Sequence, residues 1–536
     1  MSLADQLLSV VSGLARHWPW LNRTANSIAI NSRVNVGRNR PHPWSTRTDY
    51  VSWSALSDRT YYARLLPADA SFPEIESLGS KRPPISEVVK LFAATGAQRT
   101  CPKSTCLFPA FAQYLTDGFL RTSLINDDTK SDRRRTTSYH DIDLSQLYGR
   151  TGVQTSALRL GSEATGERGR LRSQIVNGEE YPPLLHLPSG EVDPLFESLD
   201  VPLGIDHASA EGLTTLFAVG GDRVNAGPQI AMINTLLLRE HNRLAAVIET
   251  TKPGWGDERV FETARNCVIV MFIKIVVEEY INHINSTPFK LQALPEISYR
   301  AKWNRPNWIT IEFALLYRWH SLVPENVVWA RREVQGTDTL LNNSVLVQYG
   351  LVAAFADVSA NGATELGLQN SATFLQRAEL KALEQSRLNR VATFADYCRA
   401  MGKTVPRDFA ALVGSSPVPA EQSRRSALAT ELSDLYGSVE NVEFYVGLFA
   451  EPQQRNSPLP DLIGIMVAMD AFSQALTNPL LSEHVWGDPA VRRSTFTDAG
   501  LAAITNTSCL NDVLARNTTD RGNRFVGMTK PEWKRS

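Results

Sequence analysis

Apolar residues recur at intervals of three and four along most of this chain. Four stretches show the spacing clearly: FAQYLTDGFLRT, INTLLLREHNRLAAVIET, RVFETARNCVIVMFIKIVVEEYINHI and DFAALV. Such spacing places apolar side chains on one face of an α-helix, whereas the alternation typical of strands is rare. Breaks rich in Pro, Gly, Ser and Asp, such as HLPSGEVDP and QQRNSPLPD, separate the stretches. The pattern therefore predicts a mainly α fold.

The N-terminal residues 3–21 form an apolar stripe at helical spacing, from Leu3 to Trp18. Such a stripe usually packs on its own protein, but Trp18 and Trp20 beside Arg16 also suit a helix on a membrane surface. The stretch lacks the basic start and cleavage motif of a signal peptide. A cytoplasmic protein is therefore expected, either free or in peripheral contact with a membrane.

Composition excludes several functional classes. The chain has 536 residues, 43% hydrophobic and 21% charged, which suits one large core or two to three average domains. Its 55 basic and 56 acidic residues leave a net charge of -1, so nucleic acid is not an expected partner. Five scattered cysteines predict neither a disulfide framework nor a metal cluster. The longest apolar run, CVIVMFIKIVV, is interrupted by Lys274 and is predicted to be core rather than a membrane span.

The segment IEFALLYRWHSLVPE, residues 311–325, places a tyrosine and a histidine three residues apart among apolar neighbours. On a helix, Tyr317 and His320 would project to nearly the same side. A neutral imidazole can ligate heme iron, and that iron can oxidise a nearby phenol to a radical. From this pair alone, a core histidine with a packed tyrosine is the commoner explanation.

Six segments, in chain order, resemble the cyclooxygenase (prostaglandin H synthase) branch of the animal heme peroxidases and fatty-acid dioxygenases. They are SWSALSDRTYYARLLP, FAQYLTDGFLRT, DIDLSQLYGRTG, LLLREHNRL, FALLYRWHSLVP and ELSDLYGSVENVEFYVGLFAEP. The resemblance runs from about residue 50 to about residue 520. It implies a helical fold with heme between distal and proximal helices, a catalytic domain over 51–536, and a shortened membrane-contacting segment over 1–50.

The resemblance also implies roles for residues around the heme. His320 is expected to be the proximal heme ligand, and Tyr317 the radical that takes hydrogen from the fatty acid. Ordinary animal peroxidases lack this tyrosine, so its presence favours an oxygenase. Trp319 is expected beside the heme, Tyr280 as a hydrogen-bond partner of the radical tyrosine, and Tyr445 as an indirect support of the proximal histidine.

For the substrate, the resemblance implies a channel that holds a fatty acid by its carboxylate. Arg64, in TYYARLLP, aligns with the arginine that pairs with this carboxylate, a role suited to a guanidinium. The tyrosine that normally assists it aligns with Thr287. Ser473, in DAFSQAL, resembles the channel serine if one gap is allowed. With Tyr280, the other expected channel residues are Ile281, Ile284, Phe313 and Leu316.

The distal side departs from the family pattern. Gln113 matches the distal glutamine, but the distal histidine position four residues later is Asp117, expected on the same helical face. A carboxylate with an ordinary pKa of about 3.9 is a poor proton donor near neutrality, so weak peroxidase activity is expected unless burial keeps Asp117 protonated. Arg223, in GDRVNAGP, aligns with the distal arginine of animal peroxidases, and would either stabilise heme-bound peroxide or pair with Asp117.

The expected cofactor is one noncovalent heme b per chain. The positions that form ester bonds to heme in some peroxidases are Thr116 and Ala226, and neither is a carboxylic acid. A calcium ion is not expected, because the companion acid of the calcium loop is replaced by Gly118.

The predicted reaction is dioxygenation of an unsaturated long-chain fatty acid. The tyrosyl radical takes a hydrogen atom from the lipid, and O2 traps the carbon radical as a hydroperoxide. One alternative is a heme peroxidase acting on small phenols or halides, and another is a noncatalytic heme or lipid carrier. The sequence leaves open the chain length, the carbon attacked, α-oxidation next to the carboxylate, and whether the protein is a monomer or a homodimer.

Overall fold

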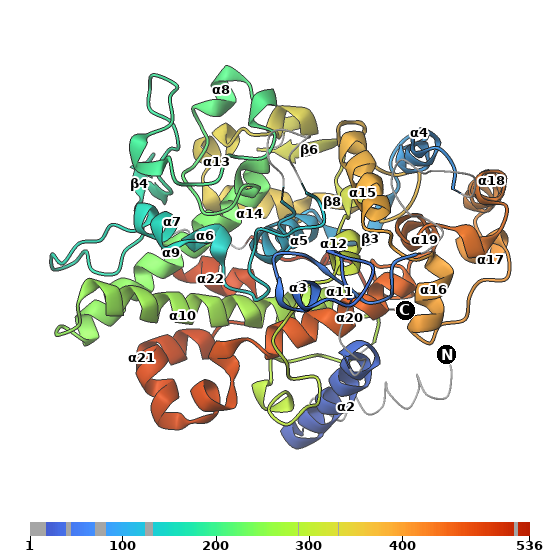
Figure 1. The fold of residues 1–536 in the computed structure, drawn as a ribbon. Coiled ribbons are helices and arrows are strands. Elements are labelled where there is room, and N and C mark those ends of the chain that lie inside the picture. Colours follow the sequence, from blue (N-terminus) through green and yellow to red (C-terminus); the bar gives the residue numbers. More distant parts are fainter. Residues whose placement is uncertain are drawn as a thin grey trace.

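The computed structural model describes residues 18–38, 44–69, 82–123, 132–287, 289–330, 332–518 and 524–535. Helices dominate these ranges, and their strands form only four two-stranded antiparallel sheets (Figure 1). The prediction of a mainly α fold is confirmed. Most of the apolar stripe predicted over residues 3–21 lies outside the described residues.

Three helices form the centre of the molecule: α5 (Leu107–Phe119), α9 (Pro228–Thr251) and α10 (Asp257–Ile275). Helix α9 packs against both α5 and α10 (Figure 1). It starts with a proline, whose missing N–H would have no partner in the first turn, and α10 starts with two acidic residues that suit the positive end of the helix dipole. The run CVIVMFIKIVV is core, as predicted, and Lys274 forms an ion pair with Glu278.

Helix α10 does not end as a regular α-helix. It continues as a π-helix, η5 (Val276–Ile281), followed by the short helix α11 (Asn282–Ile284). A π-helical turn is rare and is often found at functional sites. Here it carries Tyr280, whose side chain is fully buried.

The expectation that Tyr317 and His320 share one helix is wrong. Helix α12 (Ile311–Leu316) is capped at its start by Thr310, whose side chain accepts a hydrogen bond from the Phe313 amide. The helix ends at Tyr317, where φ is -89° and ψ is 8°. Trp319 then adopts φ -89° and ψ 46°, and His320 begins a separate 3-10 turn, η7 (His320–Leu322). These backbone angles, outside the α-helical range, break the helix between the two residues.

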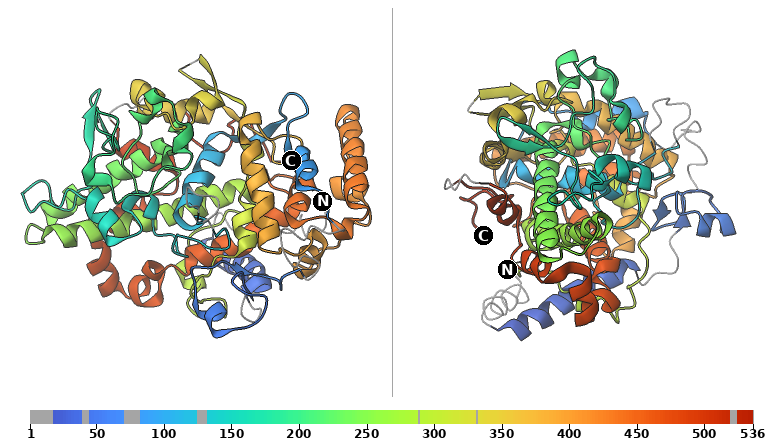
Figure 2. Two further views of the ribbon diagram at one scale, coloured as in Figure 1. Left: turned by 45° about the horizontal axis from the view of Figure 1, so that its top comes forward. Right: turned by 90° about the vertical axis from the view of Figure 1, so that its left-hand side faces the viewer.

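The second half of the predicted N-terminal segment packs on the main body. Helix α2 (Pro19–Arg38) lies along α20 (Asp461–Leu476) at the edge of the molecule (Figure 1, Figure 2). Trp303 Nε1 donates a hydrogen bond of 2.8 Å to Asn31 of α2, while Trp20 and Ile28 are each 66% exposed. Among the described helices, none combines the length and apolar character needed to cross a bilayer.

Shorter elements complete the described fold. The remaining α-helices are α3 (Trp53–Ser57), α4 (Ile85–Val88), α6 (Ser145–Tyr148), α7 (Gly152–Leu158), α8 (Ala210–Leu213), α13 (Ser344–Tyr349), α14 (Leu351–Ala360), α15 (Gln376–Leu388), α16 (Phe394–Ala400), α17 (Phe409–Val413), α18 (Pro419–Tyr436), α19 (Phe444–Ala450), α21 (Pro489–Thr505) and α22 (Leu510–Arg516). The strand pairs are β1 (Trp44–Ser45) with β2 (Ala63–Arg64), β3 (Thr100–Thr105) with β8 (Gly362–Thr364), β4 (Gln174–Val176) with β5 (Glu179–Tyr181), and β6 (Asn326–Trp329) with β7 (Arg332–Gln335).

Candidate active site

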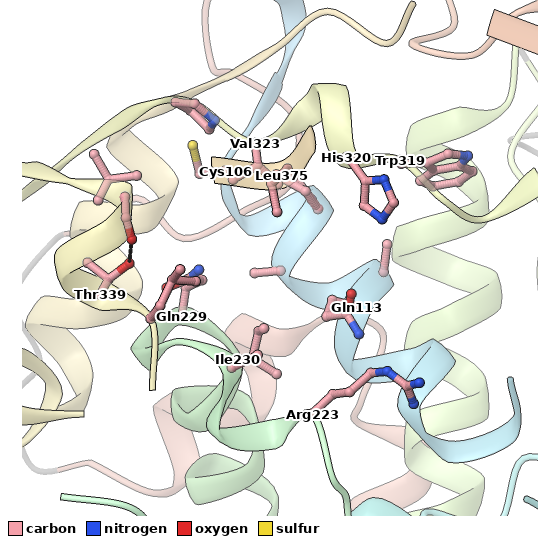
Figure 3. A pocket seen from close by; sticks show the side chains of 18 of the residues that line it. Cys106, Gln113, Arg223, Gln229, Ile230, Trp319, His320, Val323, Thr339 and Leu375 are labelled. Atoms are coloured by element: carbon pink, nitrogen blue, oxygen red, sulfur yellow. Dashed lines mark hydrogen bonds between the residues drawn. The ribbon is translucent and has the colours of Figure 1, made fainter. Parts of the chain in front are cut away.

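A cavity lies between α5, the start of α9 and the segment that follows α12 (Figure 3). Much of its wall is apolar, with side chains that include Ala110, Ile230, Val323, Val327 and Leu375. Its polar lining includes one imidazole, two guanidinium groups and the amides of two glutamines, contributed by His320, Arg223, Arg318, Gln113 and Gln229. An apolar cavity with a few converging polar groups is the usual form of a cofactor or ligand site.

His320 enters this cavity from the η7 turn, and Gln113 of α5 lies opposite it (Figure 3). On the side away from the cavity, Nδ1 of His320 lies 3.2 Å from Oε2 of Glu379, in helix α15. A carboxylate at this distance can orient the ring and leave the other nitrogen, Nε2, available for a ligand in the cavity. Glu379 was not predicted from the sequence.

Tyr317 lines the same cavity and is 9% exposed. Its ring packs edge-on against Phe313 and is stacked on Trp319, with centroids 4.8 Å apart in both pairs. Burial raises the pKa of Tyr317 above its ordinary value, and the neighbouring Tyr280 hydroxyl partly offsets this effect. The side chain is therefore a neutral phenol at physiological pH, with the Tyr280 hydroxyl as a polar neighbour.

Most residues predicted to line the substrate channel lie on elements near α12. Helix α20 packs against both α12 and η5. All the predicted channel residues on them and on α11 are buried: Tyr280, Ile281, Ile284, Phe313, Leu316 and Ser473. The Ser473 hydroxyl donates to the backbone carbonyl of Asp470, 2.8 Å away.

Arg64, the predicted carboxylate partner, is not brought to the cavity. It lies in β2 and is only 2% exposed. Its guanidinium donates hydrogen bonds of 3.0 to 3.2 Å to the backbone carbonyls of Ser45, Thr48 and Asn389. In this structure Arg64 therefore connects β2 by hydrogen bonds to the segment 45–48 and to Asn389.

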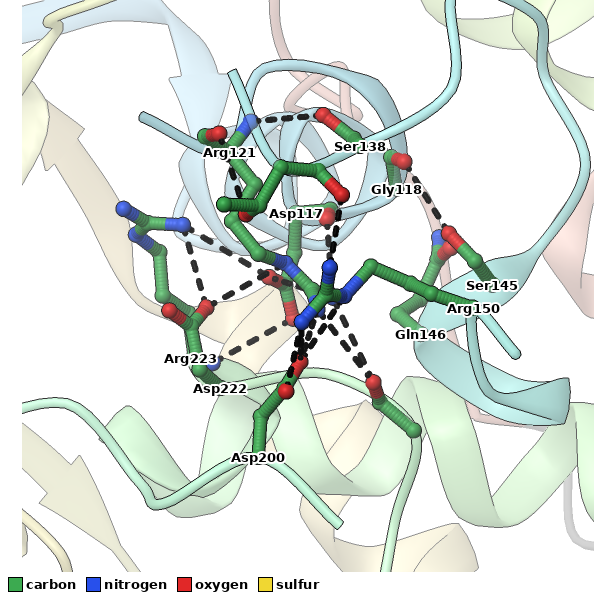
Figure 4. Close-up of polar contacts among 12 residues, drawn as sticks. Asp117, Gly118, Arg121, Ser138, Ser145, Gln146, Arg150, Asp200, Asp222 and Arg223 are labelled. Carbon is green, nitrogen blue, oxygen red and sulfur yellow. Dashed lines mark hydrogen bonds and ion pairs between the residues drawn. The ribbon is translucent and has the colours of Figure 1, made fainter. Parts of the chain in front are cut away.

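The distal residues differ in their exposure to the cavity. Gln113 and Thr116 line the cavity, whereas Asp117, one helical turn after Gln113, is fully buried and is not among the residues that line it. Its carboxylate lies 3.4 Å from Arg121 and accepts a 3.3 Å hydrogen bond from the backbone N–H of Arg223 (Figure 4). A Cβ on Gly221 would lie only 2.1 Å from Oδ2 of Asp117, so the absence of a side chain at Gly221 makes room for this carboxylate.

Asp117 belongs to a buried network of acids and arginines (Figure 4). Burial and the nearby Asp222 raise the pKa of Asp117 to about 7, although Arg121 and Arg223 act in the opposite direction. Arg121 in turn contacts Asp200 at 2.6 Å. Asp117 therefore helps to hold charged side chains in place behind the cavity, and no imidazole occupies the distal side among the described residues that line it.

Replacing Asp117 with Asn should change how stability depends on pH. The folded protein holds a proton on Asp117 between about pH 4 and pH 7 that the unfolded chain releases, so wild-type stability falls as the pH rises through that window. The Asp117→Asn variant lacks this titration. As the pH rises through that window, its free energy of unfolding should therefore increase relative to that of the wild type by on the order of 1–4 kcal/mol. Thermal unfolding of both proteins from pH 4 to pH 8 measures the difference, and a constant difference would contradict this assignment.

Arg223 both lines the cavity and lies close to two acids. Its guanidinium lines the cavity and lies below Gln113 in the view of Figure 3. One nitrogen, Nη1, is 3.1 Å from Asp222 and 3.8 Å from Asp117. Arg223 is therefore held by acids on one side and presents positive charge to the cavity on the other.

Arg318 is a second cation in the cavity wall, and the sequence analysis gave it no role. Its Nη2 donates to the side-chain oxygens of Gln385, at 2.9 Å, and Thr122, at 3.5 Å, both of them neutral. Burial and the nearby Arg223 lower the pKa of Arg318 below its ordinary value. A buried guanidinium with neutral partners is stabilised by an anionic ligand.

The donor set of the cavity fits a heme. One imidazole, His320, is oriented by Glu379 and has Nε2 available for iron, and apolar walls suit a porphyrin ring. Arg223 and Arg318 supply positive charge that suits the two propionates. Thr116 and Ala226 also line the cavity, and neither side chain has a carboxylate for an ester bond.

The chain matches the family model for animal haem peroxidase over residues 118–525. Among curated proteins, prostaglandin G/H synthase 2 of Equus caballus is 29% identical over 513 residues, which cover 95% of this chain and 78% of that protein. Prostaglandin G/H synthase 1 of Rattus norvegicus is 30% identical over 514 residues, covering 94% and 79%.

Solved structures share the fold at lower identity. Fatty acid alpha-dioxygenase of Oryza sativa has a TM-score of 0.68 and 15% identity, with 96% of this chain and 94% of that chain covered. Peroxidase A of Dictyostelium discoideum has a TM-score of 0.66 and 17% identity, covering 92% and 100%. A tyrosine-to-phenylalanine variant of the rice enzyme was solved with palmitic acid.

Proposed function

Because this chain belongs to the animal haem peroxidase family, we propose that it is a heme-dependent dioxygenase of unsaturated long-chain fatty acids that uses Tyr317 as its radical residue. The observation that carries the proposal is the position of Tyr317. This tyrosine lines the cavity that His320 enters, and its ring packs against Phe313 of α12, which in turn contacts α20. These contacts support a position for Tyr317 between the proposed cofactor and the proposed lipid.

The cofactor supported by the cavity is a noncovalent heme b, one per chain. His320 would ligate its iron, and Arg223 with Arg318 would face its carboxylates. When bound, the heme supplies a one-electron oxidant of phenols once a hydroperoxide has activated it. Thr116 and Ala226 leave the porphyrin without a covalent bond to the chain.

Tyr317 would carry the radical chemistry. Loss of one electron and the phenolic proton leaves a neutral tyrosyl radical, which takes a hydrogen atom from the fatty acid and becomes a phenol again. O2 adds to the carbon radical, and the resulting peroxyl radical takes the hydrogen atom back from Tyr317. The product is a hydroperoxide, and the tyrosyl radical is regenerated for the next turnover.

The protein's contribution is to position and shield the reacting groups. Phe313 and Trp319 pack against the Tyr317 ring. Burial raises the pKa of Tyr317, so the phenol keeps its proton until it is oxidised. The buried residues on η5, α12 and α20 would hold one methylene near the phenolic oxygen, which lowers the entropic part of the barrier. Ser473 would face the lipid from α20.

The distal arrangement favours release of a hydroperoxide. Gln113 and Arg223 line the cavity and can donate hydrogen bonds, but Asp117, at the position of the family's distal histidine, is not among the lining residues and lies against Arg121. Without a group that readily exchanges protons at this position, peroxide reduction is slow. The enzyme would therefore show weak peroxidase activity beside its oxygenase activity.

Oxygen uptake with a panel of C16 to C20 acids, followed by mass spectrometry of products formed under labelled O2, tests the proposal. We expect uptake with unsaturated acids and products that carry both atoms of one labelled O2 molecule. The position of the label separates attack along the chain from attack at the α-carbon. Heme-loaded protein that consumes no O2 with any acid of the panel would contradict the proposal.

A second candidate function is a peroxidase acting on small phenols or halides. It is favoured by Arg223, which faces the cavity and aligns with the distal arginine of animal peroxidases. A guaiacol assay with hydrogen peroxide distinguishes the two functions, since a dedicated peroxidase would oxidise guaiacol rapidly and consume no O2 with fatty acids.

A further inference from the structure

Glu379 is a buried acid on the side of His320 that faces away from the cavity. It lies in helix α15 and is only 1% exposed. Its Oε2 lies 3.2 Å from Nδ1 of His320 and accepts a 2.6 Å hydrogen bond from the Tyr445 hydroxyl. Its Oε1 accepts a 2.6 Å hydrogen bond from the Ser371 hydroxyl. Each oxygen of this carboxyl group therefore has a polar neighbour, and three side chains meet there.

Glu379 acts as a hydrogen-bond acceptor for its neighbours. The Tyr445 and Ser371 hydroxyls both donate, and burial together with the adjacent Glu379 raises the pKa of Tyr445 well above its ordinary value, so Tyr445 keeps its proton. An ionised carboxylate can accept from both hydroxyls and from the Nδ1–H of an imidazole at the same time. The geometry thus places a hydrogen-bond-accepting carboxyl group directly against the histidine that enters the cavity.

We infer that Glu379 accepts the Nδ1–H hydrogen bond of His320 and gives the proximal imidazole the character of an imidazolate. This inference deepens the proposed function and rests on His320 being the heme ligand. A carboxylate beside a ligating histidine makes its nitrogen a stronger electron donor and tunes the metal. A more electron-rich iron favours the oxidised states of the cofactor over the ferrous state.

This arrangement has a consequence for catalysis on the distal side. There, the family's imidazole is replaced by Asp117, which is not among the residues that line the cavity and pairs with Arg121. Cleavage of a peroxide bond needs either proton transfer from the distal side or electron donation from the proximal side. Glu379 supplies the proximal contribution, so the enzyme can still reach the oxidation level that Tyr317 requires.

Tyr445 modulates the strength of this interaction. Its hydroxyl donates to Oε2, the same oxygen that lies next to His320. Two donors that share one acceptor oxygen compete for its negative charge, so removal of the Tyr445 hydroxyl strengthens the bond to His320. Glu379 and Tyr445 variants should therefore shift the electron density at the iron in opposite directions, which a purely structural role does not predict.

The test is the Fe(III)/Fe(II) midpoint potential of the heme-loaded full chain. In Glu379→Gln, which keeps the shape and removes the charge, we expect the equilibrium constant for reduction to rise at least about tenfold, or about 59 mV for a one-electron couple. Tyr445→Phe should lower the potential, and Glu379→Asp should restore much of the wild-type value. Resonance Raman spectra of the ferrous protein should show a weaker iron–imidazole bond in Glu379→Gln.

Glu384→Gln is a matched control on the same helix. Glu384 pairs with Arg133 and Lys381 and is one third exposed, so its neutralisation should leave the potential unchanged. Full heme occupancy with an unchanged potential in Glu379→Gln would overturn the inference, as would shifts of equal sign in Glu379→Gln and Tyr445→Phe. Failure of the wild-type chain to bind heme would instead overturn the proposed function.

Discussion

Replacing Tyr317 with Phe is expected to abolish fatty-acid-dependent oxygen uptake, with a loss of at least about 10³-fold, while heme binding is retained. The variant keeps the ring contacts with Phe313 and Trp319, so the cavity wall should be unchanged. It loses only the hydroxyl whose hydrogen atom is removed and returned in each turnover. Oxygen-electrode traces and the heme absorption spectrum of the same preparation measure the two effects together.

Tyr280→Phe is the matched control for this experiment. Tyr280 is also buried and stacks on Trp319, but its hydroxyl is only a neighbour of the radical position. We expect a lower rate with continued turnover and a rapid-freeze radical signal that is altered in shape. In Tyr317→Phe that signal should be missing. Sustained oxygen uptake by heme-loaded Tyr317→Phe would eliminate the tyrosyl mechanism.

The sequence predicted the parts of the site that depend on local patterns. Helical spacing identified α5 and α9, and the motif around Tyr317 and His320 pointed to both residues that enter the cavity. Gln113 and Arg223 were found by resemblance and also line it. These residues lie close in sequence to recognisable segments, so their positions follow once the fold is known.

Other features depend on contacts between distant segments. Helical periodicity placed Asp117 one turn after Gln113, but it did not reveal that this carboxylate is buried beside Arg121 instead of lining the cavity. No propensity rule predicts the π-helix that carries Tyr280. The break after Tyr317 depends on backbone angles at Trp319 that its apolar neighbours do not reveal.

Glu379 was missed because its partner is far away in the chain. In QRAELKALEQSRL it resembles an ordinary surface charge on a helix. A signal was nevertheless present, because Glu379 shares helical spacing with Ala382, Leu383 and Ser386, all of which are buried. A charged residue on the buried face of a helix needs a partner, and this criterion would have selected it.

Replacing His320 with Gln is expected to weaken heme binding by more than about 100-fold. Changes to groups that merely support a metal ligand already lower metal affinity or activity by roughly 10- to 100-fold, and His320 would be the ligand itself. The variant leaves Glu379 with Tyr445 and Ser371 as hydrogen-bond donors, so the fold should survive. Added imidazole should restore part of the heme binding by filling the space left by the ring. The control is His207→Gln, which removes an exposed imidazole that does not line the cavity and should bind heme normally.

The most direct test is the Soret absorption of the purified protein titrated with hemin. The wild type should develop one Soret band that saturates at one heme per chain, and His320→Gln should lack it at the same concentrations. Equal, saturable heme binding by the wild type and His320→Gln would contradict the assignment of His320 as the iron ligand, on which the roles of Tyr317 and Glu379 depend.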